Sequence, residues 1–300
     1  MLAADNIELR GELTNTNYGS HLTGTTLSWS SDPVSVSLNY ASLQQRLPTW
    51  STNASINPSE LFAFQVNPGV TGLTSISTAH QLGRGFSLFF STATAGYEKG
   101  GAFSESSYGL TLSAQNYQVV FKAGLLSEKE QFLGTTGYGA YSMGSPAKTT
   151  FWSLGSSLKL GEKTALSSRY SAAKTAVRFK YEELASSSDI LTDEFQVSLS
   201  RTGMITATGT LAINLHAPLS VKAGQINQST TLGYTANGDY NTVQRSYSLV
   251  GDSRERVLSL VFRQPGKSMQ GFAGVFTRLN ADGAKGSVDT GIRLGLTSSF

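Results

Sequence analysis

Hydrophobic and polar residues alternate along most of this chain, in short segments bounded by Gly, Ser, Asn, Asp or Pro. Side chains in a β-strand point alternately to the two faces of a sheet, so a period of two predicts strands rather than helices. The pattern predicts an all-β fold of about 12 strands, with 14 possible because the first two or three candidates are the weakest. The candidate strands are residues 7–14, 25–31, 34–42, 73–81, 86–95, 108–115, 118–127, 149–160, 164–175, 193–202, 210–222, 254–264, 270–280 and 289–300.

The last candidate strand separates its two faces completely. Counted back from the C-terminus, every large apolar residue falls on one face and every charge on the other. The segment is long enough to cross a bilayer at a tilt, for which about 9–11 residues suffice. We expect this strand to pair with the first strand and thereby to close the predicted sheet into a barrel. We assign Ile292, Leu294, Leu296 and Phe300 to a lipid-facing side, and Asp289 and Arg293 to a lumen-facing side.

The second face of the candidate strands is small and polar. Phe195, Val197 and Leu199 alternate with glutamine and serine, and residues 108–113 and 258–263 repeat this pattern. A soluble β-sandwich, the alternative fold, would carry Lys and Glu on its exposed face. Ser, Thr, Gly and Gln in those positions favour a transmembrane antiparallel β-barrel with a polar lumen.

The composition changes this prediction little but excludes other classes. Charged residues make up 14% of the chain, against about a quarter in an ordinary soluble domain. No run of about 18 apolar residues exists, so a transmembrane helix is not predicted. The chain contains no cysteine, which removes disulfides and thiol chemistry. Its net charge of +3 is dispersed, so nucleic acid is not an expected partner.

The connections between candidate strands alternate in length. Residues 116–117, 161–163 and 281–288 are short to moderate connections. Membrane barrels have short periplasmic turns and longer extracellular loops. We therefore predict surface loops at the long stretches, which are residues 96–107, 128–148, 176–192 and 224–245.

Two sets of residues resemble known outer-membrane families. The ending Gly295–Phe300 resembles the terminal strand that the barrel-assembly machinery recognises in outer-membrane proteins. A second set consists of four motifs: KAGLLSEKEQFLG at 122–134, FQVSLSRTG at 195–203, APL at 217–219 and RQPG at 263–266. In order and spacing, these motifs resemble the C-terminal translocator β-barrel of subtilase-type autotransporter proteases. This resemblance covers about residues 70–300 and departs at Ala217 and Lys267, where that family usually has Gln and often His.

The protease of that family has no counterpart in these residues. A subtilase needs Asp, His and Ser in three motif contexts. His21, His80 and His216 stand in none of them, and the last two fall within candidate strands as lumen or interface side chains. We predict no catalytic, cofactor-binding or metal-binding residue and no enzyme activity. The resemblance implies that a longer parent protein carries a subtilisin-like protease passenger.

Three groups of charged residues remain as weaker candidates. Residues 251–256 (GDSRER) either line the lumen or form internal salt bridges, although a solvated loop is the favoured interpretation. The carboxylates of Glu128 with Glu130, and of Glu182 with Glu183, are expected to be surface charge on loops.

These observations predict a bacterial outer-membrane protein, with residues 1–300 as a single barrel and residues 1–70 its weakest part. The predicted function is a translocator barrel that supports surface export of an N-terminal passenger. The alternatives are a stand-alone channel for small solutes and a soluble β-sandwich binding module. Expected partners are outer-membrane lipid, the barrel-assembly machinery and the passenger domain. Residues 1–5 lack the features of a signal peptide, so we expect a fragment or a processed product.

Overall fold

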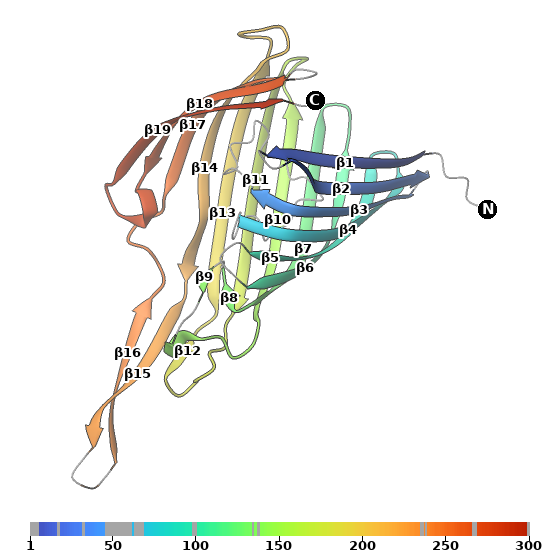
Figure 1. Cartoon of the computed structure of the whole chain (residues 1–300). Coiled ribbons are helices and arrows are strands. Elements are labelled where there is room, and N and C mark those ends of the chain that lie inside the picture. The colour runs from blue at the N-terminus through green and yellow to red at the C-terminus, as the bar shows by residue number, and fades with distance from the viewer. Residues whose placement is uncertain are drawn as a thin grey trace.

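The main sheet of the computed structural model has 14 strands, all antiparallel to their neighbours. Strands that follow one another in the main sheet also pair with one another, and the sheet is strongly curved (Figure 1). The structure describes residues 6–16, 19–31, 34–45, 62, 69–97, 101–133, 135–136, 139–234, 237, 239–265 and 269–298. In order, the strands are β1 (Asn6–Thr16), β2 (Gly19–Ser31), β3 (Val34–Gln45), β4 (Gly69–Gly83), β5 (Phe86–Tyr97), β6 (Ala102–Ser113), β7 (Tyr117–Lys129), β10 (Ala147–Lys159), β11 (Thr164–Ala176), β13 (Ile190–Thr202), β14 (Thr210–Ala223), β17 (Arg256–Gln264), β18 (Met269–Leu279) and β19 (Val288–Ser298).

Each of the candidate strands from the sequence corresponds to one strand of the main sheet, so the fold class is confirmed. Of the two strand counts that the sequence allowed, 14 is the one observed in the main sheet, because the weak N-terminal candidates also belong to it. β2 and β3 pair in regular register from Gly24 to Ser31. Their charge-free, Ser- and Thr-rich sequences made the alternation hard to read, but they satisfy the ladder as well as later strands do.

The two faces of the main sheet differ in chemistry. On β6, Tyr108 and Leu110 are 64% and 37% exposed, whereas Ser107 and Thr111 beside them are buried. Exposed and buried residues alternate along this strand from Ala102 to Leu112. A contiguous exposed apolar surface of this kind marks contact with a membrane or partner. Other exposed apolar residues on this outer face are Leu27, Leu38, Ile76, Leu88, Phe90, Phe121, Leu125, Trp152, Leu154, Leu166, Leu199, Ile213, Leu215, Leu258, Leu260 and Val275.

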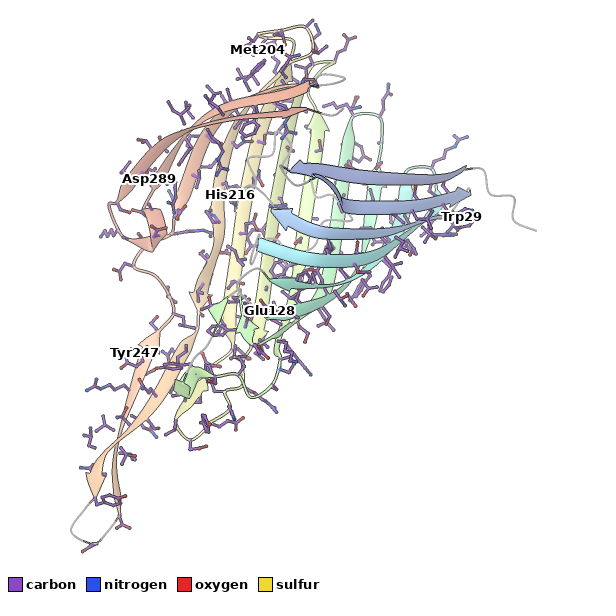
Figure 2. All side chains as sticks on the ribbon, viewed as in Figure 1. Trp29, Glu128, Met204, His216, Tyr247 and Asp289 are labelled. Carbon is purple, nitrogen blue, oxygen red and sulfur yellow. The ribbon has the colours of Figure 1, made fainter. Side chains whose placement is uncertain are left out.

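Connections of different length lie at the two ends of the sheet. Because consecutive strands are antiparallel, successive connections fall alternately at one end and the other. We call these the turn end, which carries Met204, and the loop end, toward which Glu128 and Tyr247 lie (Figure 2). The turn end has the connections β2–β3, β4–β5, β6–β7, β10–β11, β13–β14 and β17–β18. The loop end has the connections β1–β2, β3–β4, β5–β6, β7–β10, β11–β13, β14–β17 and β18–β19.

One predicted long loop is wrong. Residues 96–107 were expected to be a loop, but β5 continues to Tyr97 and β6 begins at Ala102. Ser104 and Ser106 occupy outward positions there, while Phe103 and Glu105 point inward and are buried. The alternation is present but inverted in polarity, so a search for apolar outward residues missed it.

The long connections at the loop end fold onto each other rather than standing free. Small strands β12 (Ala185–Ser187), β15 (Gln225–Tyr234) and β16 (Tyr240–Ser248) form a second sheet, and the β15–β16 hairpin projects from the barrel (Figure 1). Short strands β8 (Gln131–Phe132) and β9 (Thr135–Thr136) and helix η1 (Gly139–Tyr141) follow β7, and η2 (Ala281–Gly283) precedes β19. A buried apolar cluster, against which Phe132 of β8, Tyr141 of η1 and Ile226 of β15 pack, joins the connections after β7, β11 and β14. Its buried residues are Ala147, Val177, Phe179, Ala185 and Ile190.

Glu128 is part of this folded cap and not surface charge. Its residue is 0% exposed, and its Oε2 accepts a hydrogen bond from the backbone N–H of Leu133 at 2.8 Å. The expectation that Glu128 is surface charge on a loop was wrong. Glu128 lies near the end of β7, and its buried carboxylate holds the start of the following connection in place through the hydrogen bond to Leu133. Glu130, Glu182 and Glu183 are exposed, as expected.

The strand order places β1 and β19 at its two ends, and no ladder between them occurs in the part of the chain that the structure describes. A free strand edge in hydrocarbon leaves polar groups unpaired, at several kcal/mol each. The closure of β19 on β1 therefore stays a prediction for the protein in a bilayer.

The two sides of β19 give a first test. Leu294 is 75% exposed and Arg293 is half-buried on the other face. We expect Leu294→Arg to reduce membrane insertion strongly, because a charge near the midplane of a barrel costs about 2–4 kcal/mol. Arg293→Leu should insert normally. The measurement is the abundance of each variant in the outer-membrane fraction, and normal insertion of Leu294→Arg with loss of Arg293→Leu would invert the assignment of faces.

Candidate functional site

The inner face of the main sheet carries charged side chains that are removed from bulk solvent. Glu105, Lys122, Arg169 and Glu194 are each at most 5% exposed. An unpaired charge in such surroundings would be very unfavourable. Each of these charges has an opposite partner, and the pairs define two clusters.

The first cluster joins β6, β7 and β10 to the connection between β3 and β4. The Nζ of Lys122 lies 3.4 Å from Oε1 of Glu105. The same carboxylate oxygen accepts a hydrogen bond from the backbone N–H of Phe62 at 2.9 Å. The ring of Phe62 stacks on that of Phe151, with 4.4 Å between centroids and 7° between planes. Phe62, which lies outside every strand, is thus held against the inner face by a charge and by a ring.

The surroundings of Phe62 are apolar. Phe62 is 1% exposed and Phe151 is also 1% exposed. They belong to a buried cluster that draws residues from six strands and is touched by Leu219 of β14. This cluster occupies space inside the curved sheet near the loop end. Its other members are Leu73, Ala93, Ala95, Phe103, Leu126 and Ala173.

The second cluster joins β11, β13 and β14. A guanidinium nitrogen of Arg169 lies 2.6 Å from Oε1 of Glu194 and 3.4 Å from Oε1 of Gln196. The Nε2 of His216 lies 3.3 Å from the same Glu194 oxygen. The strand register explains this grouping, because Arg169 pairs with Gln196, which pairs in turn with His216.

Between and around the charges, hydroxyl groups pair across strands. Ser91 and Ser107 are linked by a hydrogen bond of 2.7 Å. Thr149 and Thr175 are linked at 2.8 Å, and the Ser153 hydroxyl donates to Ser171 at 2.8 Å. These hydrogen bonds satisfy polar side chains on a face that alternation had predicted to be polar.

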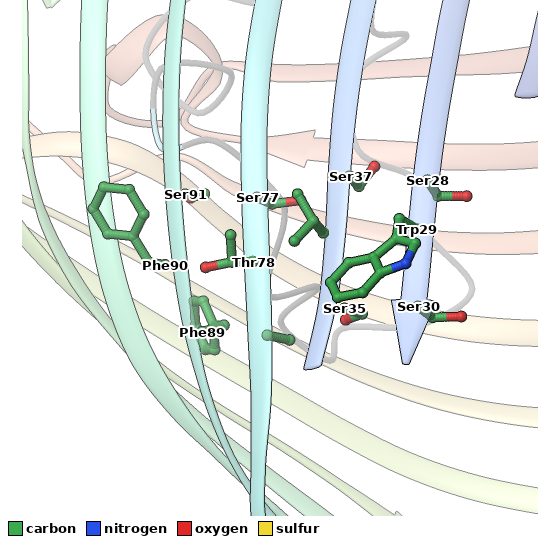
Figure 3. A pocket seen from close by; sticks show the side chains of 12 residues that line it. Ser28, Trp29, Ser30, Ser35, Ser37, Ser77, Thr78, Phe89, Phe90 and Ser91 are labelled. Atoms are coloured by element: carbon green, nitrogen blue, oxygen red, sulfur yellow. The ribbon is translucent and has the colours of Figure 1, made fainter. Parts of the chain in front are cut away.

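A separate pocket of about 350 Å³ lies over β2–β5. Trp29, Val36, Thr78 and Phe90 are cross-strand neighbours in one row of it. Figure 3 shows the rings of Trp29 and Phe90 to either side of Thr78. This row belongs to the outward face, whereas the other eight lining residues, among them Ser28, Ser37, Ser77 and Ser91, occupy inner positions of the same strands. None of the charges described above lines the pocket.

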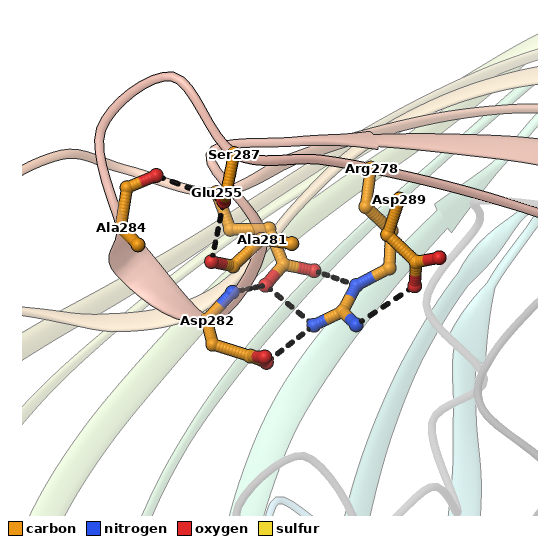
Figure 4. A network of polar contacts seen from close by, with 7 residues as sticks. All are labelled: Glu255, Arg278, Ala281, Asp282, Ala284, Ser287 and Asp289. Atoms are coloured by element: carbon orange, nitrogen blue, oxygen red, sulfur yellow. Dashed lines mark hydrogen bonds and ion pairs between the residues drawn. The ribbon is translucent and has the colours of Figure 1, made fainter.

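A charged network at the loop end joins Glu255, which directly precedes β17, to β18, η2 and β19 (Figure 4). The guanidinium of Arg278 lies 2.9 Å from Glu255, 2.7 Å from Asp282 and 3.3 Å from Asp289. Burial alone would raise the pKa of Glu255, but hydrogen bonds from Arg278 and from the Asp282 N–H outweigh it and lower the pKa. The network is therefore favoured at neutral pH and weakens in acid, as the pH falls through that lowered pKa.

Two charged residues of the segment 251–256, Arg254 and Glu255, are half-buried in salt bridges, whereas Asp252 and Arg256 are exposed. Glu255 belongs to the network just described. Arg254 lies 3.0 Å from Asp193, which is 5% exposed and also lies 3.3 Å from Lys222. Asp193 pairs with Ala172 beside a register irregularity in β13. The salt-bridge alternative from the sequence is the correct one.

The structure describes most of the residues of the last strand that the sequence assigned to a lipid-facing or a lumen-facing side. Ile292 and Leu294 are exposed, at 76% and 75%. Arg293 is half-buried on the opposite face, and Asp289 joins the Arg278 network. The side chain of Leu296 and the whole of Phe300 lie outside the described residues.

Two histidines, His80 and His216, lie in strands of the main sheet. His80 is exposed near the turn end, and His216 contacts Glu194. Among the described residues no group of three or more acidic or histidine side chains is placed to hold a metal. No helix in that same part of the chain is long and apolar enough to cross a membrane. Sequence reasoning missed Phe62 and Glu105, which no local motif marks, and assigned no role to Lys122, although it begins the 122–134 motif.

Comparison with known proteins supports the fold. Neither the models of known protein families nor the curated proteins give a match to this sequence. Comparison with solved structures shows that the chain has the transmembrane β-barrel fold of bacterial outer-membrane proteins. The anion-selective porin of Comamonas acidovorans is similar with a TM-score of 0.53 and 13% identity, over 94% of this chain and 80% of that one. A loop-deletion mutant of OmpT, an outer membrane protein of Vibrio cholerae, is similar with a TM-score of 0.50 and 10% identity, over 96% and 84%.

The buried pair of Arg169 and Glu194 gives a second test. Arg169→Met leaves a buried carboxylate with His216 alone, and breaking a buried pair in this way costs about 3–5 kcal/mol. Arg169→Met combined with Glu194→Gln should recover most of that loss. Urea unfolding of the detergent-solubilised protein measures both. Equal destabilisation by the single and double variants would show that the pair is not coupled.

Proposed function

We propose that the chain forms a passive channel for small hydrophilic solutes in the bacterial outer membrane. The observation that carries this is the inversion of the sheet: large apolar side chains face outward and paired charges with hydroxyls face inward. Such an interior stabilises water and polar solutes inside a wall that is soluble in lipid. The similarity of fold to a porin agrees with this proposal.

Phe62 is proposed to narrow the channel. Its ring lies against Phe151 on the inner face, and its backbone N–H is bonded to Glu105. A side chain from outside the strands that is fixed inside the sheet reduces the open cross-section. The ion pair of Glu105 with Lys122 lies beside Phe62 and keeps the residues around Phe62 from moving apart.

A translocator barrel is the second candidate, and sequence blocks favour it. The blocks that resemble autotransporters fall on β7 and the residues after it, on β13, on β14 and at the end of β17. A reporter domain fused before Asn6 distinguishes the two functions. Exposure of the reporter on intact cells would favour the translocator, and its retention in the periplasm would favour the channel.

Conductance across a planar lipid bilayer tests the channel and its constriction. We expect the purified protein to open ion-conducting pores, and Phe62→Ala to increase their single-channel conductance by widening the narrow part. Phe90→Ala removes an equal ring from the outward face, where Phe90 is 45% exposed, and should leave the conductance unchanged. A protein that inserts without conducting would refute the channel, and equal effects of the two variants would refute the constriction.

A further inference from the structure

The charges of the barrel are unevenly distributed around its wall. β2, β3, β4 and β5 contain no Asp, Glu, Lys or Arg at all. The next strands, β6 to β14, carry the two buried ion-pair clusters. Four adjacent strands without charge thus form one side of the barrel, and their inner face is a separate surface.

Hydroxyl groups cover this inner face in register. Ser28 pairs with Ser37, Ser37 with Ser77, Ser77 with Ser91 and Ser91 with Ser107, which places five serines in one row across five strands. Flanking inner positions on the same strands add Ser30, Ser35 and Ser75. We call these residues of β2–β5, without Ser107, the hydroxyl wall.

The row of serines is most accessible on β2, β3 and β4. Ser28, Ser37 and Ser77 are half-buried, whereas Ser91 and Ser107 are 3% and 0% exposed. The Phe62 cluster takes up inner positions of β5, β6, β7, β10 and β11, and on β4 it includes Leu73 near the loop end. The accessible part of the hydroxyl wall therefore lies on β2, on β3 and on β4 around Ser77.

We propose that the hydroxyl wall is a passage and a weak binding surface for neutral polyhydroxylated solutes, such as sugars and polyols. A serine hydroxyl both donates and accepts hydrogen bonds, as sugar hydroxyls do. A sugar that moves along the wall exchanges bonds with water for equivalent bonds with serine, so its transfer is nearly balanced in free energy. This inference rests on the proposed channel function and adds the class of solute.

A pair of matched variants separates hydroxyl chemistry from shape. Threonine and valine have nearly the same volume, but only threonine keeps the hydroxyl. One double variant therefore combines Ser37→Val with Ser77→Val, and a second combines Ser37→Thr with Ser77→Thr. Ser106→Val, on the outward face of β6, is the control for loss of a hydroxyl outside the lumen. Heat-dependent migration on SDS gels verifies that each variant is folded.

The measurement uses proteoliposomes that contain the full chain. Swelling rates in isotonic arabinose, glucose and sucrose give the sugar flux, and KCl conductance of the same preparation gives the ionic flux. We expect the ratio of sugar flux to KCl conductance to fall about fivefold in the double valine variant. The ratio should be unchanged in the double threonine variant and in Ser106→Val.

Other outcomes overturn the inference, and they can be told apart from failure of the channel. An unchanged ratio in the double valine variant, or an equal fall in the double threonine variant, would show that the hydroxyls do not act. Wild-type protein that conducts KCl but excludes all three sugars would refute the inference and leave the channel standing. Wild-type protein that passes neither ions nor sugars would refute both.

Discussion

The structure depends on one constraint: within a lipid bilayer, every backbone N–H and C=O must find its hydrogen-bond partner inside the protein. An antiparallel sheet meets this constraint through its ladders, and the main sheet does so with 14 strands in consecutive order. Side-chain chemistry is then divided by the pleat. Outward positions must tolerate lipid, so inward positions are the places where charges and hydroxyls can be used.

The charges inside the barrel follow from the same constraint. Arg169 and Glu194 are stable on the inner face because each neutralises the other at 2.6 Å. Glu105 meets both Lys122 and the backbone of Phe62, so a polar interaction also sets the position of an apolar ring. The Arg278 network has a similar effect at the loop end, where one guanidinium on β18 holds Asp289 of β19 and Glu255, the residue before β17. Electrostatics here positions parts of the wall and the residues that narrow it.

Much of the fold could be predicted because the pleat leaves its period in the sequence. Residues 289–300 and 193–202 carry that period plainly, and they correspond to β19 and β13. The start of β6 was missed because Ser104 and Ser106 are polar at outward positions. The loop-end cap was missed because its core joins three connections that are distant in sequence.

The candidate site was the least predictable part. Phe62 and Glu105 are 43 residues apart, and neither stands in a motif. Register, by contrast, brings Arg169, Gln196 and His216 into one row, and register depends on where every turn falls. A one-residue error in any of the intervening turns would move each of these side chains to the other face. Alternation therefore predicts which residues share a face, but not which of them meet.

The central claim is the inverted arrangement of the two faces, and a scan along β6 tests it most directly. The chain has no cysteine, so single cysteines can be introduced from Ser104 to Leu112 and spin-labelled in reconstituted protein. The structure predicts that labels at 104, 106, 108, 110 and 112 are relaxed by oxygen dissolved in lipid. Labels at 105, 107, 109 and 111 should be shielded from it. Equal accessibility of successive positions to a water-soluble relaxant would contradict the account.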